Sequence, residues 1–506
     1  MPENKSIGKS FIIVSLSIFS SRIFGLLRDV VIASTFGAGS LTDVFFVAFR
    51  VPNMLRRIFA EGAFSSVFTP AFAKKLKKSE KEAKRFAGKF FAVLLIALSV
   101  TVLFGEVFTP LIIKVIAPGF EGDAGTLAIA LTREMFPYIL LVSLVAFFGG
   151  ILNGYEHFFA PAVSTVLFNI SLILCAVFFK DSLSVHALAI GVIFGGVFQL
   201  LLQVLFLKKV AFIPKPILEL DEDVKKALKN IVPGLFGFGV RQLSMLADTV
   251  IASFLYVGAI SYLYYANRFV QLPLGIFAIG ISQVLLPKLA KSFDSKEGFR
   301  KKLILGLTLC SFVIVPSTYG LIFFGKPLID IVFRHGEFTF GDLRATYYVL
   351  CGYGAGLLFY SFEKILVNAF YSLDDYRFPV KVGAITLVFN IIANLFLCFV
   401  LGLGAAGLAL GTAITSLFNV IFLTRELEKR VSFSSGWIRD SVRYLFLAIP
   451  VIPVAFIGTK FYFQCTLTVF KISVVFLTVA AAVSAYFATL YITKDKIVSG
   501  LLNRRS

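Results

Sequence analysis

Four arginines stand inside apolar segments that could cross a lipid bilayer, and their side chains could bind an anion there. They are Arg22, Arg28, Arg56 and Arg268. A charged side chain at the centre of a bilayer costs roughly 2.5 to 3.5 kcal/mol on the insertion scale, so each needs a partner or a function. The acids in the same segments, Asp29 and Asp43, are fewer than the arginines. The excess of guanidinium groups predicts an anion-binding site.

The spacing of these residues predicts shared helix faces. Arg22 and Asp29 are seven residues apart and lie on one face of their helix, whereas Arg28 points to one side. The next apolar segment carries a polar stripe, flanked by Arg56, that consists of Asp43, Arg50, Asn53, Arg57 and Glu61. A further segment adds Asn267, Arg268 and Gln271. Such stripes are typical of helices that line water rather than lipid.

A diphosphate is the anion that best fits these side chains, because planar guanidinium groups bind phosphate oxygens in pairs better than lysine does. The alternative is that each arginine pairs with a nearby acid or extends to a lipid headgroup. Both alternatives stay open for Arg50, Arg57 and Glu61, which are predicted near the cytoplasmic end of their helix.

The composition places the whole chain in a membrane. Its 506 residues are 58% hydrophobic and 15% charged, with a mean hydropathy of +0.89, which is too apolar for a soluble protein of this size. The net charge of +20 resides mostly in short segments between apolar stretches. This pattern indicates membrane topology and not nucleic-acid binding. The five cysteines and three histidines are scattered without metal-ligand spacing, so no cofactor is predicted.

Segmentation at charges, Pro and Gly predicts an all-α polytopic protein with fourteen transmembrane helices. Lys and Arg concentrate in alternate connections, most densely in 74–89, and the positive-inside rule then places both termini in the cytoplasm of an inner-membrane protein. No connection is long enough for a soluble catalytic domain. The acidic clusters 219–223 and 374–375 have no partner motif, so we predict that the protein is not an enzyme.

An internal repeat divides the chain. Residues 22–39 match 241–258 without a gap, and the match pairs Arg22 with Arg241 and Asp29 with Asp248. Phe-Asn at 168–169 is likewise echoed at 389–390. Six helices separate the repeats, so two six-helix lobes share one orientation, as in transporters that rock one half against the other. We predict a first lobe at 1–215, a second lobe at 216–430, and two extra helices in 431–506. Those helices either pack on the second lobe or form a groove for a lipid tail.

The motifs in the first lobe closely resemble the MviN/MurJ family of lipid II flippases. They are Ser-Arg-Ile-Phe-Gly-Leu-Leu-Arg-Asp at 21–29 and Val-Pro-Asn-Met-Leu-Arg-Arg-Ile-Phe-Ala-Glu-Gly-Ala-Phe-Ser at 51–65. Tyr-Tyr-Ala-Asn-Arg at 264–268 and Arg-His-Gly-Glu-Phe-Thr at 334–339 extend the resemblance. It implies a V-shaped pair of lobes of the multidrug/oligosaccharidyl-lipid/polysaccharide exporter superfamily. The implied substrate is undecaprenyl-diphosphate-linked peptidoglycan precursor, moved to the periplasmic leaflet by alternating access.

The resemblance also implies roles for single residues. Arg22, Arg28, Arg56 and Arg268 match the family's essential cavity positions, and Asp43 matches a functionally sensitive acid. A sodium site in the second lobe is implied at Asp248, Asn390, Asn394, Leu408 and Thr412. Asn394 stands where an acid can occur, and Asp248 could instead pair with Arg241, so coupling to sodium or to the membrane potential stays open. We further expect a monomer that contacts membrane lipids and cell-wall synthesis machinery. The alternative function is a related polysaccharide-lipid or small-molecule exporter.

Overall fold

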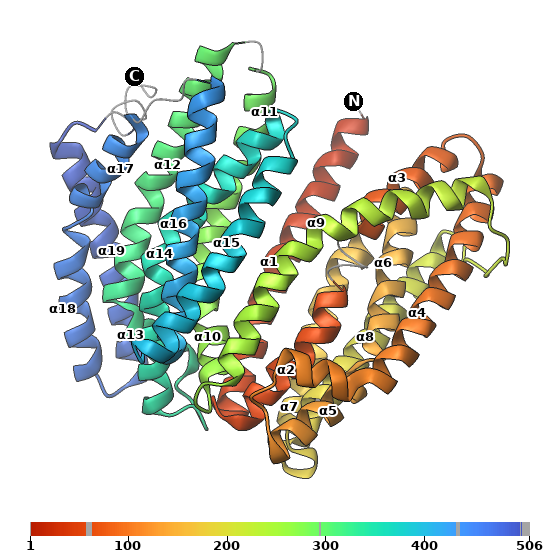
Figure 1. Ribbon diagram of the computed structural model, residues 1–506, viewed down its shortest axis with the longest axis horizontal. Coiled ribbons are helices and arrows are strands. Elements are labelled where there is room, and N and C mark those ends of the chain that lie inside the picture. Colours follow the sequence, from red (N-terminus) through yellow and green to blue (C-terminus); the bar gives the residue numbers. More distant parts are fainter. Residues whose placement is uncertain (1, 57–62, 293–294, 432–435, 496, 498–506) are drawn as a thin grey trace. The chain divides into compact units, whose positions relative to one another are not determined.

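Every regular element among the described residues is a helix, and no strand occurs there (Figure 1). The structure is a computed structural model that describes residues 2–56, 63–292, 295–431, 436–495 and 497. Within these ranges, side chains are described except at 2–15, 18, 63–66 and 230–241. The prediction of an all-α membrane protein is confirmed.

By length and composition, 11 of the described helical segments could cross a membrane. They include eleven of the fourteen predicted spans; the other three are α1 (Pro2–Phe36), the pair α2 (Ser40–Arg56) and α3 (Ala63–Leu76), and α9 (Glu222–Ser253). These three helical regions carry Arg22, Arg28, Asp43, Arg56 and Asp248. The total of fourteen therefore stays a prediction, because the described residues account for 11 spans.

The chain divides into two compact units, Met1–Ser261 and Tyr262–Ser506. In the first unit α1 packs along α7, α2 packs against α5, and α9 packs against α3 and α4. Its other helices are α4 (Glu80–Ile116), α5 (Gly122–Met135), α6 (Tyr138–Gly154), α7 (Phe159–Leu183) and α8 (His186–Lys209). The repeat assigns α9 to the second lobe, whereas contacts group α9 with the first unit. The lobe boundaries predicted from the repeat therefore stay a prediction.

The second unit is built around α14 (Phe340–Ser372), which packs against α11, α12 and α16. Its other helices are α10 (Ala259–Pro273, which begins in the first unit), α11 (Ile279–Ala290), α12 (Lys296–Phe323), α13 (Gly325–Phe333), α15 (Arg377–Leu395), α16 (Gly404–Val431), α17 (Gly436–Leu447), α18 (Val451–Gln464) and α19 (Thr468–Ile492). Two π-helical turns, η2 (Leu274–Ala278) and η3 (Phe396–Val400), interrupt the segments that carry Arg268 and Asn394. Such turns frequently occur at functional sites.

Side-chain caps explain where several helices begin. Asp221 accepts a hydrogen bond from the Val224 amide at the start of α9, at 2.9 Å. Thr339 and Asp342 form a reciprocal capping box at the start of α14. Because these bonds satisfy amides that have no partner inside the helix, they stabilise the first turns.

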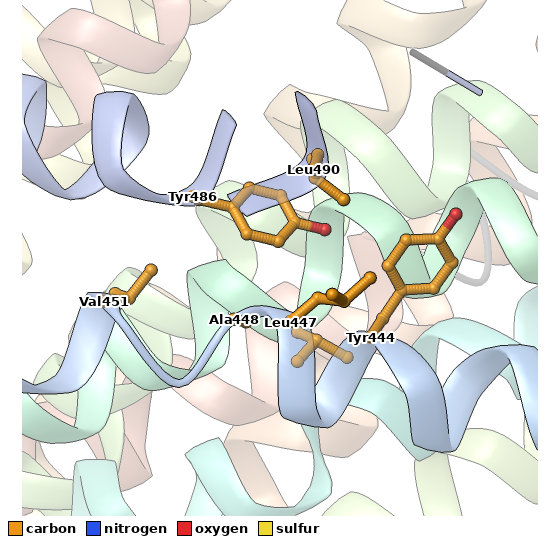
Figure 2. Close-up of a cluster of buried hydrophobic side chains, with 7 residues drawn as sticks. Tyr444, Leu447, Ala448, Val451, Tyr486 and Leu490 are labelled. Carbon is orange, nitrogen blue, oxygen red and sulfur yellow. The ribbon is translucent and has the colours of Figure 1, made fainter. Parts of the chain in front are cut away.

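The two C-terminal spans pack on the second unit. Figure 2 shows Tyr444, Leu447 and Ala448 at the end of α17 against Tyr486 and Leu490 of α19. Buried acids add polar contacts at two places. Asp330 of α13 accepts hydrogen bonds from Tyr462 of α18, at 2.7 Å, and Lys471 of α19, at 3.3 Å. Asp495, which follows α19, contacts Arg443 and Tyr444 of α17. These helices were predicted either to pack on the second lobe or to form a groove for a lipid tail. The observed contacts support packing on the second unit.

Candidate functional site

The guanidinium group of Arg28 is held by two side chains of the first unit. Its Nε and one terminal nitrogen donate to a carboxylate oxygen of Asp29, at 3.0 and 2.7 Å, and its other terminal nitrogen donates to Oδ1 of Asn169, at 3.1 Å. Asp29 is fully buried and Asn169 nearly so. Asp29 therefore forms an ion pair with its neighbour Arg28, although spacing placed it on one face with Arg22.

Asn169 connects α7 to α1 at the turns that carry the first two arginines. Besides accepting from Arg28, it donates a long hydrogen bond of 3.5 Å to the carbonyl oxygen of Ser21, next to Arg22. Asn169 was not among the site residues predicted from the sequence. The Phe-Asn echo between 168–169 and 389–390 was the signal that could have identified it.

Arg22 and Arg56 are the other arginines that the first unit contributes. The side chain of Arg22 is exposed and forms no hydrogen bond or ion pair with any described residue. Arg56 donates from Nε to Oδ1 of Asn53 at 3.1 Å, one helical turn away in α2. Arg22 can therefore bind a ligand without breaking a described hydrogen bond. The hydrogen bond from Arg56 to Asn53 orients the Arg56 side chain.

Asp43 caps the turn before α10. One carboxylate oxygen accepts from the Gly258 amide at 2.7 Å, and the other accepts from the Ser261 amide at 2.7 Å and its hydroxyl at 2.6 Å. The side chain is almost completely buried. A carboxylate at a helix N-terminus also interacts favourably with the helix dipole. Asp43 thus links α2 to the turn after α9, and its contact with substrate stays a prediction.

The charges predicted to be structural are only partly described. Arg50 donates to the carbonyl oxygen of Met245 at 3.0 Å and to the Thr249 hydroxyl, which ties α2 to α9. Arg57 and Glu61 lie outside the described residues, as does the side chain of Arg241. The predicted pairing of Arg241 with Asp248 is therefore not assessed, and Asp248 is half-buried.

Arg268 is the arginine of the second unit. Its guanidinium carbon lies 4.4 Å from the centroid of the Tyr264 ring, one helical turn earlier in α10, and a terminal nitrogen donates to the Tyr264 hydroxyl. An aromatic face attracts a cation, and a stacked guanidinium keeps its orientation. Tyr264 was noted only as part of the Tyr-Tyr-Ala-Asn-Arg motif, and the structure adds its role in positioning Arg268.

Four of the implied sodium ligands belong to a polar region of the second unit. Asn394 donates to Oδ1 of Asn390 at 3.1 Å, and Asn390 donates to the Thr415 hydroxyl at 3.2 Å; both asparagines are buried. The Thr412 hydroxyl donates to the Leu408 carbonyl oxygen at 3.0 Å. Amide, hydroxyl and carbonyl oxygens are the neutral ligands that a sodium ion accepts in transporters, next to interrupted helices such as η3. Asp248 belongs to the other unit. The residues of this region therefore suit a small cation, and the site itself stays a prediction.

Half-buried, hydrogen-bonded arginines in a chain with 11 candidate membrane spans define a class of protein. Together with the two helical units, they are typical of a transporter for an anionic substrate. A family model described as "Lipid II flippase MurJ" matches residues 32–482. The chain belongs to this lipid II flippase MurJ family.

Individual relatives agree with this assignment. The chain is similar to a "Probable lipid II flippase MurJ" of Buchnera aphidicola subsp. Acyrthosiphon pisum, with 39% identity over 83% of this chain and 84% of that protein. Among solved structures it resembles a lipid II flippase MurJ in an inward closed conformation, with a TM-score of 0.79, 27% identity, and coverage of 96% of this chain and 100% of the other. An inward-facing multidrug-resistance transporter of the MOP superfamily, 14% identical over 85% of this chain and 99% of the other, shares the fold with a TM-score of 0.68.

Proposed function

We propose that this protein is a lipid II flippase that moves undecaprenyl-diphosphate-linked peptidoglycan precursor from the cytoplasmic to the periplasmic leaflet by alternating access. Membership of the family over residues 32–482 supports the substrate class. The single observation that carries the proposal within the molecule is the guanidinium group of Arg28, fixed on a membrane helix by Asp29 and Asn169.

We propose that Arg22, Arg28, Arg56 and Arg268 bind the diphosphate. Arg28 and Asp29 form a neutral pair, so Arg28 contributes mainly oriented N–H groups. Arg22 and Arg56 then supply the net positive charge that the first unit contributes to the proposed binding site. Because the orientation of Arg28 and Arg268 is already set, the substrate does not bear the entropic cost of ordering those two side chains.

We propose that Asp43, a predicted substrate contact, also takes part in gating. Its carboxylate holds the Gly258 and Ser261 amides through charge-assisted hydrogen bonds in the conformation described. Transport requires at least two conformations, and breaking such buried bonds costs more than breaking exposed ones. Release of this cap would therefore be one of the energetic steps between the conformations.

The proposal also covers the location of the protein, its oligomeric state, its partners and the driving force of transport. The protein would reside in the inner membrane with both termini in the cytoplasm, act as a monomer, and meet the cell-wall synthesis machinery. The drive would come from the membrane potential, from sodium, or from both. An inside-negative potential favours outward movement of an anion, at roughly 2.3 kcal/mol per charge per 100 mV.

The direct test is complementation of a strain depleted of its own lipid II flippase, coupled to an assay of precursor exposure at the outer leaflet. Arg28→Ala should abolish translocation, and Arg28→Lys should restore little, because lysine cannot reproduce the fork-shaped contacts with Asp29 and Asn169. Arg300→Ala, at an exposed arginine in the first turn of α12, is the control. Full translocation by Arg28→Ala would refute the assignment of this arginine to the substrate.

A further inference from the structure

The segment that joins α8 to α9 is a strap without regular secondary structure. Along residues 212–215 the side chains of Phe212 and Pro214 are buried, whereas those of Ile213 and Lys215 are exposed. Along these four residues, buried and exposed side chains alternate. We refer to the exposed apolar and basic side chains of the strap as its outer face.

Ion pairs hold the strap to α4. Lys89 of α4, almost completely buried, lies 2.6 Å from Oε1 of Glu219 and 2.8 Å from Oδ2 of Asp221. Arg85, one turn earlier, pairs with the other oxygen of Glu219 at 2.8 Å. Hydrogen bonds from Lys89 and Arg85 lower the pKa of the Glu219 carboxyl below its ordinary value. Glu219 is therefore charged at neutral pH, and both acids of the strap pair with basic residues of α4.

Close backbone contact adds to this attachment. The Ile217 amide donates to the Gly88 carbonyl oxygen at 3.0 Å. A Cβ atom at Gly88 would lie only 2.7 Å from the carbonyl oxygen of Lys215, so any larger residue there would displace the strap. Phe212 stacks on Phe72 of α3, with ring centroids 6.5 Å apart. These contacts fix which side chains face away from the protein.

The outer face is apolar and basic. Leu218 is 84% exposed, and Ile213 and Leu220 are also exposed, although all three lie outside the membrane-spanning helices. Lys215 of the strap is exposed, and so are Lys208 and Lys209, the last two residues of α8. The membrane-spanning helix α8 ends at Lys209, so Ile213 lies at most about 14 Å along the chain from the end of that span. The strap therefore starts close to the end of a candidate membrane span.

We propose that the outer face of this strap, residues 211–221, is an interfacial membrane anchor that binds the anionic headgroup surface of the leaflet in which α8 ends. Exposed Leu and Ile side chains beside lysines are the combination that inserts shallowly into an anionic interface. Each lysine near such a surface contributes attraction, and the acids do not oppose it because Lys89 and Arg85 neutralise them. The strap thus attaches to the bilayer on one face and to α4 on the other.

The test uses tryptophan fluorescence of the full chain in vesicles that contain phosphatidylglycerol with brominated acyl chains. The native chain has 1 tryptophan, which supplies a constant background. Emission from the Leu218→Trp variant should fall by about a third or more when brominated lipid replaces ordinary lipid, because bromine quenches only a nearby indole. Glu222→Trp, at an exposed acid in the first turn of α9, is the matched control and should be quenched by aqueous acrylamide instead.

A Leu218→Trp side chain that acrylamide quenches and brominated lipid does not would overturn the proposal. The electrostatic part has its own test in vesicles of neutral phosphatidylcholine with the same brominated chains, where quenching should be at least twofold weaker. Equal quenching in neutral and anionic vesicles would overturn the preference for an anionic surface. Neither measurement requires transport, so the result is independent of the proposed flippase activity.

Discussion

Arg28 illustrates how a membrane protein accommodates a charged side chain that the lipid bilayer disfavours. Side chains of two helices engage three nitrogen atoms of its guanidinium group, and one of these partners carries the opposite charge. A buried pair of this kind contributes little net stability, but removing one partner is costly. The value of the arrangement lies in the fixed direction of the N–H groups, which favours Asn169 as a positioning residue.

Asn169→Leu should weaken binding of a diphosphate lipid by about tenfold, because loss of one hydrogen bond to a charged group corresponds to about 1.4 kcal/mol. Asn169→Asp keeps an acceptor for Arg28 but adds a negative charge, so stability should be retained while affinity falls. Binding by native mass spectrometry and thermal unfolding would separate the two effects.

The matched control for Asn169 is Ser171→Ala on the same helix. Ser171 is buried and donates to the Gly191 carbonyl oxygen at 3.0 Å, away from Arg28. Its removal should lower stability without changing the affinity. Equal losses of affinity in the Ser171 and Asn169 variants would show that Asn169 acts only through packing.

Asp43→Asn should release the turn before α10. The amide group of asparagine places N–H donors against the Gly258 and Ser261 amides, which are donors themselves, so at least one buried bond is lost at a cost of about 1 to 3 kcal/mol. Hydrogen exchange of these two amides should accelerate, and translocation should fall. The isosteric change Asp123→Asn, at an exposed acid in the first turn of α5, should alter neither; unchanged exchange in the Asp43 variant would contradict the cap.

At the scale of elements, close helix contacts depend on small residues. The helices α14 and α16 pack along each other, and a Cβ atom at Gly356 would lie 2.6 Å from the Cβ of Ala413. Glycine and alanine at such positions let membrane helices approach closely, which is how helices associate when lipid removes the hydrophobic driving force. The strap likewise approaches α4 closely at a small residue, Gly88.

Gly88→Ala should detach the strap from α4, because the added methyl group cannot coexist with the Lys215 carbonyl oxygen in its present position. Hydrogen exchange and limited proteolysis of residues 212–221 should both increase several-fold. Gly383→Ala, at a helical glycine of α15 with open space around it, is the control. A strap that stays protected in the Gly88 variant would show that the ion pairs of Lys89 suffice to hold it.

At the scale of the whole molecule, the two units differ in their buried polar chemistry. The first unit holds Arg28 with Asp29 and Asn169, whereas the second holds Asn390 and Asn394 among neutral oxygens. In the repeat, Ala247 of α9 stands opposite Arg28, so the second copy of the repeat lacks this cation, although α9 itself belongs to the first unit. This asymmetry favours anion binding by the first unit and cation binding by the second.

Translocation should fall severalfold when the membrane potential is dissipated with sodium held constant, if the potential drives transport. Removing sodium at constant potential should then have little effect, and the opposite pattern would assign the drive to sodium. Asn394→Asp restores a carboxylate at the cation region and should increase any sodium dependence, measured as the sodium concentration for half-maximal translocation. An unchanged sodium response in that variant would argue against a cation site at Asn394.

The amino-acid sequence by itself determined the membrane location, the all-helical class and the family, because hydrophobic length, charge placement and a dense motif are local properties of the chain. It also identified the arginines, since a charge in an apolar segment stands out without any knowledge of its neighbours. Only the tertiary structure decided which partner each charge has. Asp29 pairs with Arg28, Asp43 caps the turn before α10, and Tyr264 stacks on Arg268. Asn169 contacts Arg28 across 141 positions of sequence, and helical periodicity cannot predict such a contact because it describes one helix at a time.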